Sequence, residues 1–239
     1  MVDLRKTPGL QHTVALMTDT VAGTVLNLER LDAAKISISL NPGRRLFKPM
    51  MEGRPVDWAV RMCKLEKPHN VDPNIGLVEA FAPYAAGKAV PWFNACEKHF
   101  YPISSGVVVP VQPSGYLAED GRLKVLWVQS WKGRTLDPLQ KSIFNTILRD
   151  TFFVGDFKDA PLEWLDLREH KKGQGREIEV LTGDEMGTVS RADLVEYMRI
   201  LLAAFEQYSA AKAARKAAEK AEAAKQKAPR PTPLFPDEL

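Results

Sequence analysis

The chain has 239 residues, 45% of them hydrophobic and 26% charged, which suits a globular protein with a core of its own and leaves no apolar run of the ~18 residues that a membrane span needs. Residues 1–208 hold 26 basic and 26 acidic side chains, whereas residues 209–239 hold seven and four. The net charge of +3 therefore lies in the C-terminal part, which argues against nucleic-acid binding through an overall positive charge.

The N-terminal part of the chain predicts short elements. Residues 1–34 indicate a short helix or strand around TVAGTVLNLERL, with mixed periodicity. In AKISISLNPGRR, Ile36, Ile38 and Leu40 alternate with polar residues ahead of Asn-Pro-Gly. This pattern predicts a half-buried strand that ends in a turn.

The next segment, RPVDWAVRMCKLEKP, predicts a helix. Trp58, Met62 and Leu65 are spaced to form its apolar face, and Pro68 is expected to end it. Residues 68–104 are rich in proline, glycine and aromatic residues and predict no definite element.

Two apolar runs in the middle of the chain, Val107–Val111 and Leu123–Val128, surround a polar connection with Asp120 and Gly121. Asp-Gly is a hairpin turn signal, so we expect the two runs to pair as a β-hairpin with a long loop. Pro110 cannot donate to a strand ladder, and the first strand should therefore lie at an edge or carry a bulge.

Two amphipathic helices are predicted in the second half. Asp137 can cap a helix over residues 137–153, whose first position Pro138 suits. Ser190 and Asp193 form a capping-box-like start for a helix over residues 190–208. Their apolar faces consist of Leu139, Ile143, Phe144, Ile147 and Leu148 in the first helix and of Leu194, Val195, Met198, Leu201, Leu202 and Phe205 in the second. Between them, PLEWLDLREHKKGQGREIEVLTG predicts two strands joined by a basic, glycine-containing turn.

These elements predict an α+β fold in which a mainly antiparallel sheet is packed by the two amphipathic helices. One globular domain is expected over residues 1–208. Residues 209–228 are almost entirely Ala, Lys, Glu and Arg, which predicts a solvated helical extension. Residues 229–239 are rich in proline and are expected to form a disordered tail.

The end of this tail, PTPLFPDEL, combines bulky apolar residues with acids. Leu234 and Phe235 would fill a pocket of a partner protein, and Asp237 and Glu238 would meet a basic rim. The segment resembles the short Leu-Phe peptides of bacterial proteins that bind the replication sliding clamp, and the acidic, aromatic tips of single-strand-binding proteins, although the glutamine ahead of the clamp motif is absent. We predict a docking peptide, and the alternative is an inert terminus or one that folds back on its own domain.

Two segments place basic residues beside aromatic rings, and a third is a basic turn. A groove for single-stranded nucleic acid uses cations to meet phosphates and rings to stack on bases, so these segments are candidate nucleic-acid contacts if they share a face. The alternative is ordinary solvated loops with the tryptophans in the core. The candidates are Arg44, Arg45 and Lys48 around Phe47; Trp131, Lys132 and Arg134; and Lys171, Lys172 and Arg176.

Cys63, His69, Cys96 and His99 are residue types that can form a tetrahedral zinc site, and Cys96 and His99 could clip a turn. A Cys-x-x-Cys pair is missing, and the simpler interpretation is two buried thiols and two ordinary histidines. We therefore expect no metal and no cofactor. Two cysteines cannot form a disulfide framework, and the N-terminus lacks an apolar signal core, which together predict a cytoplasmic protein.

A set of acids suggests a further alternative. Asp156, Asp159 and Asp166 precede Glu169 and Lys171, and metal-dependent nucleases use acids to hold Mg²⁺ and a lysine to position water. So short a match arises easily in a chain with 30 acids. Ser/His/Asp order, Gly-x-Ser-x-Gly, Gly-x-Gly-x-x-Gly and Walker loops are absent from the sequence, which excludes hydrolase, dehydrogenase and ATPase readings that depend on them.

The leading hypothesis is a non-enzymatic accessory protein of bacterial or mobile-element DNA metabolism. It would bind single-stranded nucleic acid weakly through the basic and aromatic loops and a partner protein through the tail, without contacting a membrane. One alternative is an assembly or adaptor protein with no nucleic-acid role. The other is the metal-dependent nuclease.

Overall fold

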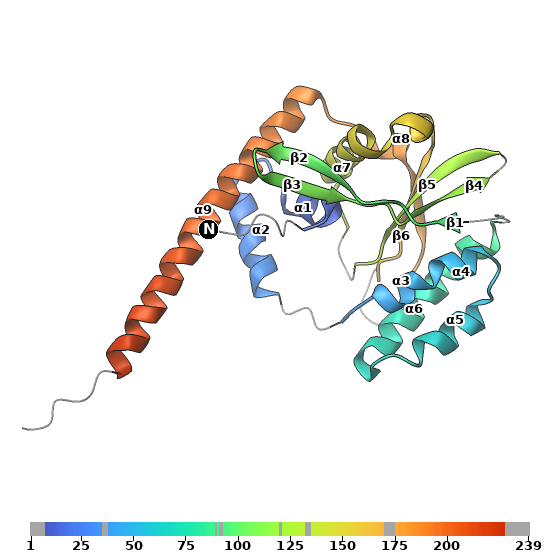
Figure 1. The fold of residues 1–239 in the computed structure, drawn as a ribbon, viewed down its shortest axis with the longest axis horizontal. Helices are drawn as coiled ribbons and strands as arrows, with labels where there is room; N and C mark the ends of the chain where they lie inside the picture. The colour runs from blue at the N-terminus through green and yellow to red at the C-terminus, as the bar shows by residue number, and fades with distance from the viewer. Residues whose placement is uncertain are drawn as a thin grey trace, which may run out of the picture.

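The computed structural model describes residues 8–34, 38–88, 90, 93–119, 121–131, 135–169 and 175–227. Its fold is the α+β arrangement that the sequence predicts, with helices on both faces of a five-stranded sheet and a separate two-stranded sheet (Figure 1). Across these residues, no helix combines the length and the apolar character that crossing a bilayer would require.

The five-stranded sheet has the order β1-β4-β5-β6-β7. Its neighbours are antiparallel except for β5 and β6, which run parallel because helix α7 connects them as a crossover. The predicted strands on either side of the basic turn are confirmed as β6 and β7. The strands are β1 (Phe93–Asn94), β4 (Gly115–Glu119), β5 (Arg122–Gln129), β6 (Leu162–Asp166) and β7 (Glu179–Thr182).

The predicted hairpin is wrong in one of its strands. Strand β5 pairs with β4 across the turn at Gly121, whose φ of 74° favours glycine. The run Val107–Val111 is β3, and it pairs instead with β2 (His99–Ser104). Closing the short β4–β5 loop costs less chain entropy than the long loop that the prediction required. Pro110 does lie on an edge strand, because both strands of a two-stranded sheet are edges.

Helices replace the predicted N-terminal strand. Residues 10–16 form α1 (Leu10–Leu16), and the ambiguous segment is α2 (Val21–Ala33), capped by the Thr20 side chain. Residues 38–40 are not in a strand, and residues 35–37 lie outside the described part. Asn-Pro-Gly begins α3 (Asn41–Arg45) because proline is well suited to the first turn of a helix.

A layer of helices α3 to α6 covers one face of the sheet (Figure 1). Helix α4 is Phe47–Met51, α5 is Val56–Cys63 and α6 is Pro68–Ala86. The helix α5 is confirmed, and Trp58 of its predicted apolar face is half-buried and packs against the core. The prediction is wrong for Met62 and Leu65, which are 40% and 77% exposed, whereas the small residues Ala59 and Cys63 are buried against α6. Small side chains let the two helices approach closely.

The two faces of the sheet bury separate cores. Along β5, Val125 and Trp127 belong to the core shared with α1, α7 and α9, and Leu126 and Val128 to the core under α3–α6. This alternation is what the two-residue period of a strand requires. The largest fully buried side chain, Trp164 of β6, lies in the first core.

The two predicted amphipathic helices are confirmed as α7 (Pro138–Phe152) and the start of α9 (Arg191–Lys227), but Leu139 and Val195 of their predicted apolar faces are exposed. Asp137 and Gln140 form a capping box on α7, and the Ser190 hydroxyl accepts from the Asp193 amide at the start of α9. The short helix α8 (Gly183–Met186) and a 3-10 turn (Gly155–Phe157) complete the described helices.

The C-terminal half of α9 extends from the body as the predicted helical extension (Figure 1). The first turns of this extension are not fully solvated, because α9 runs alongside α2 there. Lys212 forms an ion pair with Asp32, and Arg215 forms one with Glu29 at 2.9 Å.

Candidate functional site

A cleft of about 1010 Å³ lies between helices α1, α2, α3 and α6 and the ends of strands β5 and β6. Each of the three basic and aromatic segments of the sequence contributes one described residue to its lining: Arg44, Trp131 and Arg176. These residues are far apart in the chain. The folding of α3 against the sheet brings them to one place.

Helix α3 is held in position by two buried asparagines of α6. The Asn74 side chain accepts from the Gly43 amide at 2.7 Å and donates to the carbonyls of Ser39 and Asn70 at 2.8 and 2.7 Å. A Cβ atom on Gly43 would lie 2.8 Å from Asn74 Oδ1, so only glycine allows this approach. The backbone that carries Arg44 is therefore fixed.

Two guanidinium groups hold Ser130, at the end of β5, from different sides. Arg44 donates from Nε and Nη2 to Ser130 Oγ, at 3.0 and 2.6 Å. Arg176 donates from Nη1 to the carbonyl oxygens of Ser130 and Leu167, at 3.0 and 2.6 Å. Ser130 itself is 1% exposed. Both arginines are thus positioned by neutral acceptors.

The surroundings of Arg44 and Arg176 disfavour the charged form of each guanidinium group. Burial lowers the pKa of Arg44, and the neighbouring charge of Arg176 lowers it further. Burial also lowers the pKa of Arg176, against the opposing effect of Glu169 and Asp166. Arg44 keeps a large surface open toward solvent in the cleft, but its guanidinium group is enclosed enough to lose hydration. Among the described residues, no carboxylate lies within ion-pair distance of Arg44.

An aromatic surface lies beside these cations. The ring of Trp131 is 4.6 Å from that of His12 on α1, with their planes tilted by 58°. Burial and the charge of Arg44 lower the pKa of His12, so its ring is neutral near pH 7. Next to His12 in the sequence, the buried Gln11 side chain is hydrogen-bonded to Gln129 and Trp127, and these bonds connect α1 to β5.

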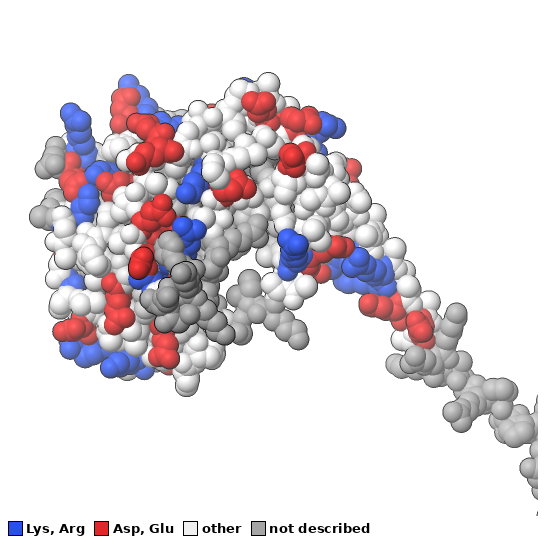
Figure 2. Space-filling view, turned by 180° about the vertical axis from the view of Figure 1, so that it is seen from behind, with Lys and Arg blue, Asp and Glu red and all other residues white. Residues whose placement is uncertain are grey.

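The lining is not uniformly basic. Arg30 of α2 adds a third cation, and Asp72 and Glu169 add two acids. Figure 2 shows the same mixture more widely, with acidic and basic side chains interspersed over one face of the body. Among the lining residues that the structure describes, three side chains are cationic and two are acidic.

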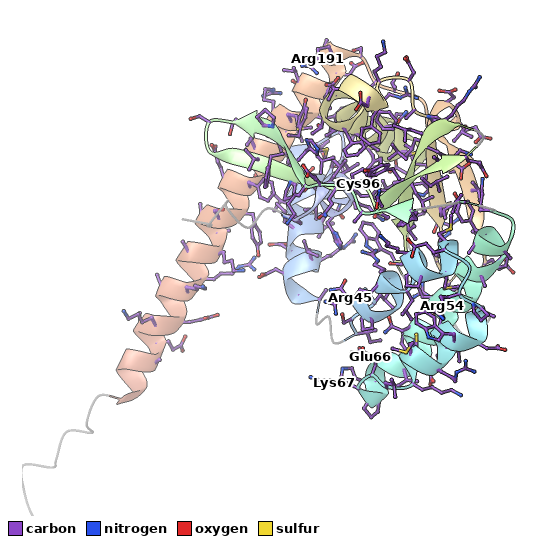
Figure 3. All side chains as sticks on the ribbon, turned by 45° about the vertical axis from the view of Figure 1, so that its right-hand side comes forward. Arg45, Arg54, Glu66, Lys67, Cys96 and Arg191 are labelled. Atoms are coloured by element: carbon purple, nitrogen blue, oxygen red, sulfur yellow. The ribbon has the colours of Figure 1, made fainter. Side chains whose placement is uncertain are left out.

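The remaining basic candidates have other places. Arg45 is on α3 (Figure 3) but does not line the cleft. Lys48 forms an exposed ion pair with Glu52 at 3.6 Å. Neither residue is among the described residues that line the cleft with Arg44, and their contact with nucleic acid stays a prediction. Candidates outside the described residues are Lys132, Arg134, Lys171, Lys172, Leu234, Phe235, Asp237 and Glu238.

Sequence reasoning missed His12, Arg30 and Ser130. Ser130 had a usable signal, since Gln129-Ser130 is a polar pair at the end of an apolar strand. His12 and Arg30 had none, because they reach the cleft only through the packing of α1 and α2.

The zinc candidates do not form one site. Cys63 lies in the core under α3–α6 and Cys96 in the core on the opposite face. Figure 3 shows Cys96 well away from Glu66 and Lys67 in the turn that follows α5. Burial raises the pKa of Cys96 to about 12, as expected for a buried thiol.

The candidate nuclease acids are separated as well. Asp166 is buried at the end of β6 beside Arg168, at 3.4 Å, whereas Asp159 follows the 3-10 turn on an exposed loop. Within the described ranges, no group of three or more His, Cys, Asp or Glu side chains could hold a metal ion. Lys171 is not among the described residues.

A second group of partly buried charges lies where α6 packs over β4, β5 and β6. Lys88 and Lys124 contact Glu119 at 3.0 and 2.5 Å, and Lys124 also contacts Glu163 at 2.6 Å. The Tyr84 hydroxyl donates to Glu163. Each charge here has an opposite partner, so this cluster has a structural role.

Neither a protein-family model nor a curated protein sequence matches this chain. The cleft is therefore the basis for a functional interpretation. It offers donors for an anion at Arg44 and Arg176 and an aromatic surface at Trp131, which together suit a ligand with a phosphate and a flat ring.

Proposed function

We propose that the protein binds single-stranded nucleic acid in the cleft, as a non-enzymatic accessory protein of DNA metabolism. The observation that carries the proposal is the convergence of Arg44, Trp131 and Arg176 on one cleft. Cations that meet phosphates and rings that stack on bases are the components of a single-strand site. The proposed location is the cytoplasm, where the two free cysteines would stay reduced.

The aromatic surface favours an unpaired strand over a duplex. In a double helix the base faces are stacked on one another, and only an unpaired base can present its face to Trp131. The limited positive charge of the lining supports weak binding, because each phosphate contact contributes through counterion release. Recruitment of a partner protein through Leu234 and Phe235 remains part of the proposal.

The adaptor alternative has one observation in its favour. Helix α9 continues well beyond its ion pairs with α2, to Lys227, and leaves an exposed helical surface (Figure 1). An adaptor that works through this surface would form complexes that do not depend on the cleft.

The proposal is tested by fluorescence anisotropy of the full chain with labelled single- and double-stranded oligonucleotides of about 12 nucleotides, in salt from about 50 to about 200 mM. Arg44→Ala and Arg45→Ala are a matched pair, since the residues are adjacent and on the same helix but only Arg44 lines the cleft. Loss of hydrogen bonds to a charged group should weaken binding about tenfold or more in Arg44→Ala, with Arg45→Ala near the wild type.

Both variants keep the lysine-rich extension, so nonspecific binding by that polycation affects them equally. Tighter binding of the single strand with selective loss in Arg44→Ala supports the proposal. Equal affinity of the two variants would remove the cleft from consideration, and no binding by the wild type would leave the adaptor as the better explanation.

A further inference from the structure

The two arginines of the cleft have hydrogen-bonding capacity left over. A guanidinium group has five N–H donors. Arg44 uses Nε and Nη2 on Ser130, and no described residue accepts from its Nη1. Arg176 uses Nη1 on the carbonyls of Ser130 and Leu167, and within the described ranges its Nε and Nη2 have no acceptor. Both side chains are therefore oriented by protein acceptors and still able to donate to a ligand.

We propose that Arg44 and Arg176 form a subsite for one phosphate group, and that the cleft takes a single nucleoside phosphate unit instead of a longer run of a strand. If the proposed function holds, this nucleoside phosphate unit is the end of a nucleic-acid strand, and in this respect the inference rests on the proposed function. A free mononucleotide has the same chemistry and would fit the same subsite. The residue that unites the subsite is Ser130, which both arginines contact.

The charges explain why an anion belongs there. Two guanidinium groups hold the same buried serine, and the acceptors that orient them are neutral oxygens. The carboxylates of Glu169 and Asp166 favour the charge of Arg176, whereas Arg44 has no carboxylate partner among the described residues. A partly desolvated charge without an opposite partner raises the energy of the folded state. A phosphate in contact with both would neutralise them, and paired N–H donors of arginine match phosphate oxygens in geometry.

An acid of the lining opposes a second phosphate. Among the described residues, Asp72 of α6 shares the cleft with Arg44 and Arg176. A strand that continued past the two arginines would bring a further phosphate toward this carboxylate and meet repulsion.

The rest of the cleft suits a nucleoside. Trp131 is half-buried and packs against the core, and the part of it that lines the cleft offers an aromatic surface for a base. His12 beside it is neutral and adds a second ring. Asn27 also lines the cleft and uses its amide Nδ2 on the Leu16 carbonyl, at 3.2 Å. An asparagine amide can hydrogen-bond to the edge of a base.

The test is isothermal titration of the full chain with a nucleoside 5′-monophosphate, the matching nucleoside, and single strands of increasing length with and without a terminal phosphate. We expect the monophosphate to bind and the nucleoside to bind at least about tenfold more weakly, because the charged contacts are lost. Strand affinity should gain from a terminal phosphate and not from length. The slope of log affinity against log salt should stay below about 1.5, as for one or two neutralised charges.

Variants assign the subsite. Arg44→Ala should lose monophosphate affinity about tenfold or more, Arg44→Lys should recover part of it, and Arg45→Ala should match the wild type. Circular dichroism melts confirm that each variant is folded. Arg44→Lys keeps the positive charge, so it remains informative if the alanine variant unfolds.

The outcomes separate this inference from the proposed function. Monophosphate and strand ends that compete with each other support both. Monophosphate binding without strand binding supports the subsite and ends the nucleic-acid proposal. Strand affinity that rises with length, with a salt slope of about 3 or more and no monophosphate binding, overturns the subsite and leaves the proposal standing. If neither ligand binds, both are wrong.

Discussion

The two groups of partly buried charge differ in how their charges are neutralised. Around Glu163, two lysines and two glutamates form contacts of 2.5 to 3.5 Å, and Tyr84 adds a hydroxyl donor. In the cleft, Arg44 and Arg176 contact a hydroxyl and two carbonyl oxygens. Both groups lie against β5 or its end. Each charge of the first group has an opposite partner, whereas in the described part of the cleft Arg176 has Glu169 and Asp166 nearby and Arg44 has no carboxylate partner.

The pKa of Lys124 in the first group and that of Arg44 in the cleft are shifted in opposite directions. Burial opposes the charge of Lys124, yet its hydrogen bonds with Glu119 and Glu163 raise its pKa above the ordinary value. The pKa of Arg44 is lowered by burial and by Arg176. A charge that lacks an opposite partner is typical of sites where a ligand supplies one. The comparison therefore favours a structural role for the first group and the proposed binding role for the second.

The largest stability effect should come from the neutralised group. Glu163→Gln keeps an acceptor for Tyr84 but removes the charge that faces Lys124 and Lys88. We expect the free energy of unfolding to fall by about 2–3 kcal/mol, because breaking a buried ion pair leaves charge without a partner. Urea denaturation measures this.

The control is Glu52→Gln, which removes an exposed i,i+4 pair with Lys48 and should change the free energy of unfolding by about 0.5 kcal/mol or less. If the two variants are equally stable, the cluster does not contribute as we describe. Ligand affinity should be unchanged in both.

The next effect concerns the contact of Asn74 with Gly43, which holds α3 in place and is called the clamp. The new Cβ of Gly43→Ala would meet Asn74 Oδ1 at 2.8 Å and Leu77 Cδ2 at 3.2 Å. Overpacking of this kind costs about 1–3 kcal/mol, and the displaced helix should also lower affinity for the phosphate ligand. Thermal melts and titration measure the two effects.

Gly76→Ala provides the comparison, because Gly76 is inside α6 and the nearest atom to its Cβ, Arg176 Cδ, is 3.9 Å away. This variant should gain up to about 1 kcal/mol from helix propensity. A destabilisation equal to that of Gly43→Ala would contradict the clamp.

A small effect is expected for the stability of Arg44→Ala. Its loss removes hydrogen bonds to Ser130 and also removes repulsion with Arg176, so the free energy of unfolding should change by less than about 1 kcal/mol. Urea denaturation of Arg44→Ala and Glu163→Gln, measured side by side, compares their free energies of unfolding. A loss as large as that of Glu163→Gln would mean that Arg44 is a structural residue.

The smallest effect is the pH dependence of His12. Its pKa is lowered by burial and by Arg44, so the unfolded state takes up a proton that the folded state does not, and stability falls as pH drops below the ordinary value of about 6.5. Arg44→Ala should raise the pKa, seen by NMR titration of the ring. A bound phosphodiester, whose charge is constant in this range, should also raise it, so affinity should increase as pH falls. No change in either case would place His12 apart from the site.

The fold was largely predictable where local signals agreed with packing. Asp137 and Pro138 marked the start of α7, and Gly121 marked a hairpin turn. The errors arose where tertiary contacts decide. The sequence of Val107–Val111 predicts a strand but does not show which strand it pairs with. Helix α5 buries Ala59 and Cys63 because α6 lies against them.

The site was predictable only in its residue types. Cations beside aromatic rings identified Arg44, Trp131 and Arg176, and equally Arg45 and Lys48, which lie elsewhere. The choice between Arg44 and its neighbour depends on the contact of Gly43 with Asn74, thirty-one positions away. Such a contact has no local signal in the sequence.

The central claim is the proposal that Arg44 and Arg176 together bind phosphate. The most direct test is the melting temperature of the full chain in a nucleoside monophosphate against chloride at equal ionic strength, for the wild type, Arg44→Ala and Arg45→Ala. A ligand at about 100 times its Kd should stabilise the folded state by about 2.7 kcal/mol. We expect that stabilisation in the wild type and Arg45→Ala and its loss in Arg44→Ala. Equal shifts in all three proteins, or none in the wild type, would contradict the claim.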